Sequence, residues 1–329
     1  MTAAPKICVA GVGALGGGLA VRLARTDACL SVVARGETLR RIQADGLVLD
    51  DAEGTFRTHP AADCRAPNEP QDVIILAAKS HQLPSLAEAV AHAVGPQTTI
   101  IPVINGIPWW LTVGAGSPLA PARDLLDPDG ILAQFFPVSQ VVGCVAYAFA
   151  SVVAPGHVRA QRAPLLLLGD PGRHPAIPQR VLDAVTVFRD SGIGTRLCPD
   201  IAGEIWSKLA ANLATNPLSV VCEATMTDLA ADGGTCALIR DMLHEVMAVG
   251  AAYGITPKQD VDAFLQVIVG AGSHRTSMLQ DYDAGRSLEL PAIGDALLAL
   301  GAARSIPTPM ATALVRLAAF KAARKAWSR

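Results

Sequence analysis

The sequence predicts an α/β domain in residues 1–200, built on a doubly wound parallel sheet, followed by an all-α domain in residues 201–329. Three observations support this division. In the first part, short apolar runs alternate with amphipathic segments, which is typical of buried parallel strands covered by helices on both faces. A glycine-rich turn joins the first apolar run to the first helical segment. After Cys198-Pro199-Asp200, helical periodicity dominates and strand-like runs largely disappear.

The first domain contains four expected core strands and several shorter elements. The core strands are Lys6–Ala10, Leu30–Ala34, Gln71–Ala77 and Thr99–Ile104, and a helix is expected over Ala14–Thr26. Gly46–Leu49 with Gly54–Arg57 and, separately, Gly143–Ala160 with a turn at Pro155-Gly156 are expected to form hairpins, followed by a strand at Leu165–Leu168. Residues 110–130 are rich in Pro and Gly, and we expect them to be irregular.

The second domain is expected to consist of helices, because its apolar residues recur at helical spacing. The expected helices cover Ile201–Val221, Cys236–Tyr253, Val261–Val269, Leu288–Ala303 and Met310–Ala326.

The composition favours a protein that acts on small molecules. The formal net charge is only −2 in 329 residues, so no basic surface for nucleic acid or an anionic membrane is expected. Aromatic residues make up 4%, which also argues against a surface for stacking bases. Residues 131–158 carry no Asp, Glu, Lys or Arg and are long enough to span a membrane. Pro and Gly interrupt this stretch, however, so buried strands are the better interpretation.

Seven cysteines are scattered singly along the chain, without a Cys-x-x-Cys pair or a Cys/His cluster of metal-ligand spacing. We interpret them as small buried hydrophobic residues in a reducing compartment. We therefore expect a cytoplasmic protein without a metal site.

The turn at residues 11–16 carries the pattern G-x-G-x-x-G and reads Gly11-Val12-Gly13-Ala14-Leu15-Gly16. It follows an expected strand and opens an expected helix, which is the context of a Rossmann-type dinucleotide site. The first glycine permits a tight turn, the second lets the main chain approach a pyrophosphate, and the third allows close packing of helix on strand. The helix N-terminus adds N–H groups that favour phosphate. We therefore predict that these six residues bind a nicotinamide dinucleotide.

The end of the second expected strand indicates which dinucleotide is bound. It reads Val33-Ala34-Arg35-Gly36, with no acidic residue before Glu37. An NAD site needs an acid here for the ribose 2′-hydroxyl, whereas a cation suits the 2′-phosphate of NADP. Arginine can bind phosphate through two parallel hydrogen bonds. Arg35 therefore predicts NADP(H), with an ordinary exposed loop arginine as the alternative.

Further polar residues follow the later strands of this domain. Lys79 and Gln82 follow the third core strand and Asn105 follows the fourth, at the carboxyl edge where open α/β sheets bind ligands. We expect Gln82 near the adenine and Lys79 at a phosphate or on the substrate side. The polar start of a helix, or a turn at Asn105-Gly106, would also explain these residues without a ligand.

The most informative stretch of the second domain is a helical stripe of three polar residues. Lys208, Asn212 and Asn216 are spaced i, i+4, i+8 and therefore share one face of a largely apolar helical segment. Exposed helix faces usually carry Glu, Lys, Arg and Gln rather than Asn. The stripe suits the wall of a polar cleft that donates to a carbonyl and a carboxylate, with a solvated face as the alternative. Pro217 should bend or restart the helix.

Taken together, these motifs resemble the ketopantoate reductase (2-dehydropantoate 2-reductase) family. The resemblance also includes Ser277-Met278-Leu279-Gln280-Asp281, followed by Gly285-Arg286 and Glu289, and it covers nearly the whole chain in order. It implies a small-molecule 2-oxo acid as the partner and an NADPH-dependent reduction of 2-dehydropantoate to (R)-pantoate, a step toward pantothenate.

The resemblance also implies roles for individual residues. Lys208 would polarise the ketone and protonate the alkoxide as the general acid, and Glu289 would hold the substrate hydroxyl and help to set the lysine. The remaining substrate contacts would be Ser277, Asn212, Asn216 and Asn105, and Asn105 would also contact the cofactor. Hydride delivery builds charge on the ketone oxygen, so an ammonium group placed there stabilises the transition state.

The sequence departs from the family pattern at two places. Leu290-Pro291-Ala292 follow Glu289 where the family commonly has an Ile-Asp-like pair. Pro291 is expected in the first turn of the next helix, where proline is tolerated. Residues 106–110 include Trp109-Trp110 and are bulkier than a minimal substrate loop needs. Both departures leave open a relative that reduces a different 2-oxo acid. A catalytically silent NADP-binding sensor is a second alternative, and the apolar helical half leaves room for a homodimer interface.

Overall fold

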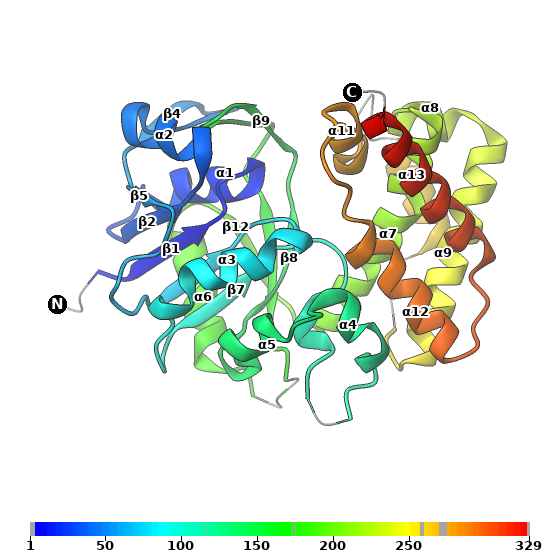
Figure 1. Ribbon diagram of the computed structural model, residues 1–329, viewed down its shortest axis with the longest axis horizontal. Helices are drawn as coiled ribbons and strands as arrows, with labels where there is room; N and C mark the ends of the chain where they lie inside the picture. The colour runs from blue at the N-terminus through cyan, green and yellow to red at the C-terminus, as the bar shows by residue number, and fades with distance from the viewer. Residues whose placement is uncertain are drawn as a thin grey trace. The chain divides into compact units, whose positions relative to one another are not determined.

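Two units make up the chain (Figure 1). Each has its own hydrophobic core. The computed structural model describes residues 4–327 apart from 115, 173, 175, 257–259 and 270–274. Unit 1 contains Met1–Ile104 and Asp129–Ile201, and unit 2 contains Asn105–Pro128 and Ala202–Arg329.

A five-stranded parallel sheet forms the centre of unit 1. Its strands are β1 (Lys6–Ala10), β2 (Cys29–Val33), β5 (Ala61–Asp63), β6 (Val73–Leu76) and β7 (Thr99–Pro102), in the order β5-β2-β1-β6-β7. All four pairings are parallel. The chain first builds outward from β1 through β2 and then returns to add β6 on the other side, so the order reverses between β1 and β6. This confirms the predicted doubly wound sheet, and ligands bind at such a reversal point.

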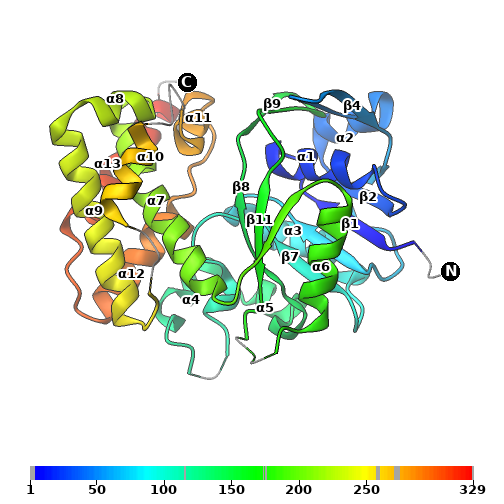
Figure 2. The same ribbon diagram turned by 180° about the vertical axis from the view of Figure 1, so that it is seen from behind.

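Helices and two smaller sheets complete unit 1. The helices that flank the candidate site are α1 (Ala14–Leu23), α2 (Gly36–Asp45) and α3 (Leu83–Val90). A second sheet, in the order β4-β3-β10-β9, contacts α1 through β3 (Leu47–Asp51), β4 (Gly54–Thr58), β9 (Ala150–Ala154) and β10 (His157–Ala160). A third sheet contains β8 (Gly143–Tyr147), β11 (Leu165–Gly169) and β12 (Gly194–Leu197). Helix α6 (Gln179–Asp190) contacts β11 and β12. Figure 2 shows α6 and β11 from behind.

The predicted hairpin over Gly143–Ala160 is wrong in its first strand. Only β9 and β10 pair around the Pro155-Gly156 turn, whereas β8 pairs with β11 in another sheet. β8 is buried over residues 143–146, so it requires partners in the interior, while β9 is a largely exposed edge strand. The other predicted hairpin, formed by β3 and β4, is confirmed. Helices α2, α3 and α6 were not assigned residue ranges from the sequence. Helix α2 buries only Ile42, α3 has only eight residues, and α6 follows a Pro-rich segment.

Unit 2 is helical, as predicted. Its longer helices are α7 (Ile201–Cys222), α8 (Met226–Ala231), α9 (Gly233–Ala252), α10 (Val261–Val269), α11 (Ser277–Asp283), α12 (Ala296–Ala303) and α13 (Pro309–Trp327). Their buried faces meet in one core that includes Trp206, Met242 and Leu279. The predicted helix over Leu288–Ala303 is in fact a π-helical turn, η6 (Pro291–Asp295), followed by α12.

The predicted division into residues 1–200 and 201–329 requires a correction. Residues 105–128 belong to unit 2, although the sequence-based division assigned them to the first domain. They pack there because η4 (Ala120–Ala122) contacts α12 and α4 (Arg123–Leu126) contacts η6. Ile107 and Leu119 are buried in the same core as the helices of unit 2.

The cysteines are only partly the buried residues that we expected. All seven are unbridged, but Cys29, Cys64 and Cys222 are exposed, because they lie at the start of β2, beyond the edge strand β5 and at the end of α7. Cys8 in β1 fits the expectation, and its burial raises the pKa of its thiol to about 11.

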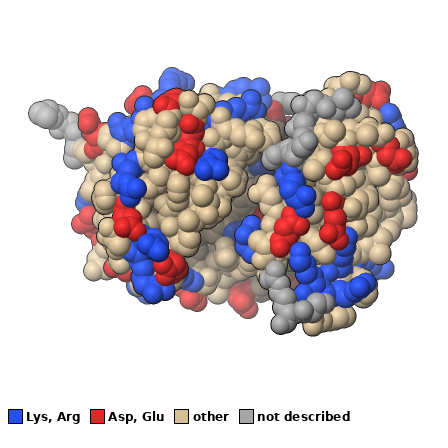
Figure 3. Space-filling model, turned by 90° about the horizontal axis from the view of Figure 1, so that it is seen from above, with Lys and Arg blue, Asp and Glu red and all other residues tan. Residues whose placement is uncertain are grey.

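The face of the molecule seen from above carries charges of both signs (Figure 3). Lysine and arginine alternate with aspartate and glutamate over the face seen in Figure 3. Among the described helices, none is both long and apolar enough to cross a membrane. Helix α13 exposes three large apolar side chains, Leu317, Phe320 and Trp327. A homodimer interface stays a prediction.

A buried ion pair fastens α1 to the second sheet of unit 1. Arg22 of α1 donates to Asp51 of β3, and both side chains are almost completely buried. We expect Arg22→Met to lower the free energy of unfolding by about 3–5 kcal/mol, because it leaves a buried carboxylate without its cation. The urea midpoint measures this. Arg25→Met is the matched control. Arg25 forms a solvent-exposed ion pair with Glu53 (3.3 Å), so its loss should change the urea midpoint little.

Candidate functional site

The glycine turn between β1 and α1 has two glycines that the protein itself requires. Gly11 has φ +92°, and a Cβ there would lie 2.7 Å from the carbonyl oxygen of Ala77, just beyond β6. A Cβ on Gly16 would lie 2.0 Å from the carbonyl oxygen of Gly11. These contacts hold the ends of β1 and β6 and the start of α1 within main-chain distance of one another.

Gly13 differs from its two neighbours, because no protein atom lies within 4 Å of the Cβ position. It is exposed, and its φ of −72° suits any residue, so neither packing nor backbone strain accounts for a glycine. It is the N-cap of α1 and offers no side chain to the first turn of that helix. The N–H groups of a first helical turn lack helical partners and favour a phosphate. The surroundings of Gly13 therefore fit the close approach of a pyrophosphate.

Arg35 is the N-cap of α2, directly after the end of β2. Its side chain reaches the start of α3, where it donates to the Ser85 hydroxyl (3.2 Å) and to the Ser85 carbonyl (2.6 Å). Arg35 is exposed, and a guanidinium has five N–H groups, so others remain for an anion. Glu37 is occupied by ion pairs with Arg40 and Arg41 in the same helix. Arg35 thus places an exposed guanidinium just beyond the end of β2.

Lys79 and Gln82 follow β6 in a short 3₁₀ turn, η1 (Ser80–Gln82). The side-chain oxygen of Gln82 accepts the main-chain N–H of Lys79 (3.3 Å), and the N–H of Gln82 donates to the Lys79 carbonyl (2.8 Å). The Gln82 amide thus closes its own turn, which supports the alternative reading of this residue as a helix start. An adenine contact by Gln82 and a ligand contact by Lys79 stay predictions.

Lys208, Asn212 and Asn216 share one face of α7. The helix continues through Pro217 to Cys222, so of the two expected effects of the proline, a bend or a restart, the restart is wrong. Proline removes one N–H from the helix, and the buried residues Leu218 and Val220 beyond it keep the last turns packed in the core. Lys208 and Asn212 are half-buried, and Asn216 is only 4% exposed.

Asn216 carries a buried side-chain donor. Its Nδ2 atom has no hydrogen-bond partner among the described residues, while its Oδ1 lies 3.5 Å from the Thr215 hydroxyl. An unsatisfied buried donor costs about 1–3 kcal/mol. A bound group with an acceptor oxygen would remove that cost, which fits the predicted role of Asn216 in substrate binding.

Asn105 and Glu289 meet although 184 positions separate them. The Asn105 amide donates to the Glu289 carboxylate (3.3 Å), and Glu289 is 8% exposed. The adjoining main chain fixes this contact, since the N–H of Ile107 donates to the Ala292 carbonyl (3.0 Å). Gly106, between Asn105 and Ile107, has φ +81°. A Cβ on Gly106 would lie 2.4 Å from the Ala292 carbonyl oxygen. The structure therefore joins two of the predicted substrate residues within unit 2.

Pro291 begins η6, in the first turn, as predicted. The N–H of Ile293 donates to the Glu289 carbonyl (3.1 Å), so Glu289 is tied to the turn that follows it. Burial raises the pKa of the Asp295 carboxyl, at the end of this turn, above its ordinary value. π-Helical turns often occur at functional sites, and this one begins two residues after the candidate catalytic residue Glu289.

Ser277 is the exposed first residue of α11. The residue before it, Thr276, is the N-cap, and its hydroxyl lies 2.7 Å from that of Ser219 in α7. Ser219 is three positions after Asn216, so this contact brings the start of α11 to the last turns of the polar stripe.

Three residues near these positions were missed by sequence reasoning. Glu204 lies one turn before Lys208 in α7 and is 8% exposed. Its i−4 spacing to the lysine was the available signal. Ser219 and Thr276 had no such signal, because only the packing of α7 against α11 brings them together.

The predicted residues divide cleanly between the two units. Unit 1 holds the expected cofactor residues Gly11, Val12, Gly13, Ala14, Leu15, Gly16, Arg35, Lys79 and Gln82. Unit 2 holds the expected substrate and catalytic residues Asn105, Lys208, Asn212, Asn216, Ser277 and Glu289. Asn105, expected to contact both ligands, therefore lies with the substrate residues.

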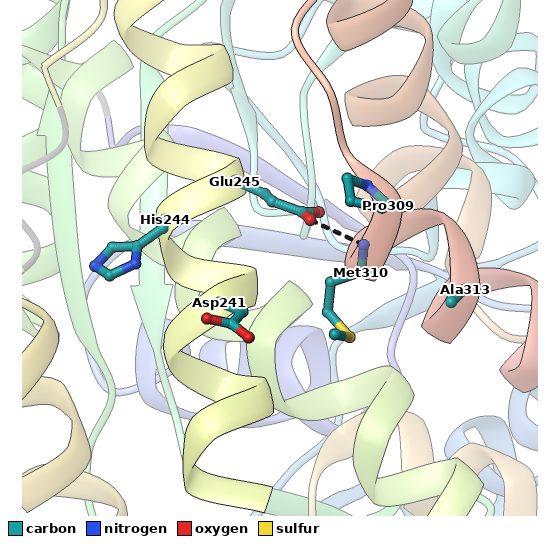
Figure 4. Close-up of a pocket in the computed structure, with 6 residues that line it drawn as sticks. All are labelled: Asp241, His244, Glu245, Pro309, Met310 and Ala313. Atoms are coloured by element: carbon teal, nitrogen blue, oxygen red, sulfur yellow. Dashed lines mark hydrogen bonds between the residues drawn. The ribbon is translucent and has the colours of Figure 1, made fainter.

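Two further features of the described residues bear on ligands. No group of three or more His, Cys, Asp or Glu side chains in the described part of the chain could hold a metal ion. A pocket of about 430 Å³ in unit 2 is lined by α9 and the start of α13, at Asp241, His244, Glu245, Pro309, Met310 and Ala313 (Figure 4). Glu245 accepts the N–H groups of Met310 and Ala311 (both 2.8 Å) and so caps α13. None of the predicted site residues lines this pocket.

Comparison with known proteins gives consistent matches along the chain. Residues 7–172 match the family "Ketopantoate reductase PanE/ApbA", and residues 200–322 match "Ketopantoate reductase PanE/ApbA C terminal". A 2-dehydropantoate 2-reductase of Mesorhizobium japonicum is 37% identical over 317 residues, which cover 95% of this chain and 96% of that protein.

Solved structures agree with these matches. The crystal structure of a candidate ketopantoate reductase from Ralstonia solanacearum superposes with a TM-score of 0.90 at 32% identity, covering 98% of this chain and 99% of that one. D-mandelate dehydrogenase, solved with NADH and anilino(oxo)acetate, gives a TM-score of 0.83 at 19% identity, covering 97% and 99% of the two chains. At that identity the second likeness concerns the fold alone.

Gly13 and Gly16 should respond in opposite ways to alanine. We expect Gly13→Ala to change stability by less than about 1 kcal/mol but to weaken NADPH binding, because its methyl group enters the space beside the first turn of α1. Gly16→Ala should destabilise the protein by about 1–3 kcal/mol despite the higher helix propensity of alanine, because the methyl group overlaps the Gly11 carbonyl. Thermal unfolding and titration of NADPH fluorescence measure the two effects. Unchanged NADPH binding by Gly13→Ala would contradict the cofactor site.

Proposed function

Because the chain belongs to the ketopantoate reductase PanE/ApbA family, we propose that it reduces 2-dehydropantoate to (R)-pantoate with NADPH. The observation that carries the proposal is the set of polar residues in unit 2. The Asn105–Glu289 hydrogen bond and the Lys208 stripe support the proposal, together with the Asn216 Nδ2 donor, which has no partner among the described residues. The similarity of the Mesorhizobium japonicum protein over almost the full length of both chains supports the same substrate.

In the proposed reaction, Lys208 is the general acid. Its ammonium group polarises the ketone oxygen and transfers a proton to it as charge develops there. Glu289, held by Asn105, binds the hydroxyl of the substrate and helps to orient Lys208. Ser277 and Asn212 bind the carboxylate and neighbouring polar atoms, and Asn216 donates its buried amide. Every polar end of a short hydroxylated 2-oxo acid thus has a counterpart in unit 2.

The nicotinamide cofactor would supply the hydride, and unit 1 has a fitting cradle for it. The first turn of α1, with the open space at Gly13, suits the pyrophosphate. Arg35 suits the 2′-phosphate, and this is our reason for proposing NADPH rather than NADH.

A family member that reduces a different 2-oxo acid is the second candidate. Pro291 replaces the usual acidic neighbourhood after Glu289, and the buried Trp109 and Trp110 enlarge the segment after Asn105. D-mandelate dehydrogenase has the same fold and was solved with another 2-oxo acid, so the fold alone does not select the substrate.

A substrate panel tests the proposal directly. NADPH oxidation is followed with 2-dehydropantoate beside aliphatic and aromatic 2-oxo acids at equal concentrations. Fast turnover of 2-dehydropantoate supports the first candidate. Negligible turnover of it, with fast turnover of another acid, supports the second. Tight NADPH binding without reduction of any 2-oxo acid would indicate an NADP-binding sensor instead.

Arg35 should separate the two cofactors. We expect Arg35→Ala to weaken NADPH binding at least about tenfold and to leave NADH binding nearly unchanged, because only NADPH carries the 2′-phosphate. Dissociation constants for both cofactors measure this. Arg40→Ala, from the same helix, is the control, since Arg40 is already paired with Glu37. An equal loss for NADPH and NADH would refute the role of Arg35.

Lys208 should control the chemical step. We expect Lys208→Ala to lower kcat by at least about 10²-fold, the usual contribution of a general acid, with little change in NADPH affinity. Steady-state kinetics with the best acid of the panel measure this. Retained turnover would remove Lys208 from the role of acid, whatever the substrate proves to be.

A further inference from the structure

A chain of hydrogen bonds connects α11 to α7 in the interior of unit 2. The N–H of Leu279 donates to the Thr276 hydroxyl (3.1 Å), which lies 2.7 Å from the Ser219 hydroxyl. The Ser219 hydroxyl in turn donates to the Asn216 carbonyl (2.8 Å). Ser219 is completely buried and Thr276 is 5% exposed, so water does not compete for these groups.

The direction of this chain follows from counting hydrogens. Each hydroxyl has one hydrogen to donate, and a carbonyl oxygen can only accept. Ser219 uses its hydrogen on the Asn216 carbonyl, so the hydrogen between the two hydroxyls must come from Thr276. The Thr276 oxygen is left to accept the Leu279 N–H. The chain therefore has one orientation, from the start of α11 to the main chain of Asn216, and adjacent bonds of this kind strengthen one another.

Both ends of the chain adjoin candidate substrate residues. Thr276 immediately precedes Ser277, and the accepting carbonyl belongs to Asn216, whose own amide has a buried donor without a partner among the described residues. We propose that Ser219 and Thr276 are positioning residues, which fix Ser277 and Asn216 relative to each other so that together they bind the carboxylate end of a 2-oxo acid. The proposal rests on the proposed function and extends it to two residues that touch neither substrate nor cofactor.

The test compares two threonines that have the same structural role. Thr276→Val keeps the shape of the side chain but removes the hydroxyl, and Thr276→Ser retains it. Thr225→Val is the matched control, because Thr225 is also an N-cap in unit 2, for α8, and is bonded to Asp228 rather than to α7. A purely structural loss would affect both valine variants alike.

We expect Thr276→Val to raise the KM for 2-dehydropantoate about tenfold, equivalent to about 1.4 kcal/mol, with a smaller change in kcat and none in the KM for NADPH. Thr276→Ser should restore the wild-type KM, and Thr225→Val should leave it unchanged. Ser219→Ala, which removes the middle hydroxyl of the hydrogen-bonded series, should give the same selective rise in the KM for 2-dehydropantoate. It replaces Thr276→Val in the test if that variant fails to fold.

A binding measurement separates this proposal from the proposed function. Calorimetric titration of 2-dehydropantoate into the complex with NADP⁺ needs no turnover, and the same tenfold weakening is expected there. Weakened binding without turnover would reject the proposed function and support the positioning role. Equal affinities in the wild type and in Thr276→Val, or an equal loss in Thr225→Val, would overturn the positioning role even if turnover is normal.

Discussion

Close approach of the main chain to itself is the constraint on which both candidate sites depend. At Gly11, Gly16 and Gly106, a side chain would overlap a carbonyl oxygen of Ala77, Gly11 and Ala292, respectively. The first two contacts bring the ends of β1 and β6 to the start of α1, which is where an open parallel sheet binds its ligand. The third holds Asn105 beside Glu289. Close main-chain contacts thus fix where the segments that carry the polar groups lie.

Within unit 2, the polar residues gain their positions from contacts between segments that are distant in sequence. Asn105 comes from the segment after β7, Glu289 from the segment before η6, and the polar stripe from α7. Hydrogen bonds, not apolar packing alone, set the register between these segments. The Ile107–Ala292 bond does this at one place, and the chain from Thr276 through Ser219 to Asn216 does it at another. A buried polar network of this kind specifies one arrangement because any shift leaves groups unsatisfied.

Sequence reasoning succeeded where the information is local. The strands β1, β6 and β7, the glycine turn and α7 all follow from the pattern within a few residues, and the family resemblance followed from the order of such motifs. It failed where the outcome depends on distant partners. β8 pairs with β11 and not with the strand next to it, and residues 105–128 join the helical unit through contacts with α12 and η6. The role of Ser219 and Thr276 depends on a contact over 57 positions, and no local pattern encodes that contact.

The assignment of residues 105–128 to the helical unit also bears on how this architecture can be taken apart. The chain passes from one unit to the other three times, after Ile104, after Pro128 and after Ile201. A fragment that begins at Ala202 would therefore lack residues 105–128, which contact α12 and η6. Glu289 would then lose its hydrogen bond from Asn105. The C-terminal helices therefore do not form a complete unit that gene fusion or recombination could move as one continuous segment. Any exchange between relatives has to carry two separate pieces of sequence together.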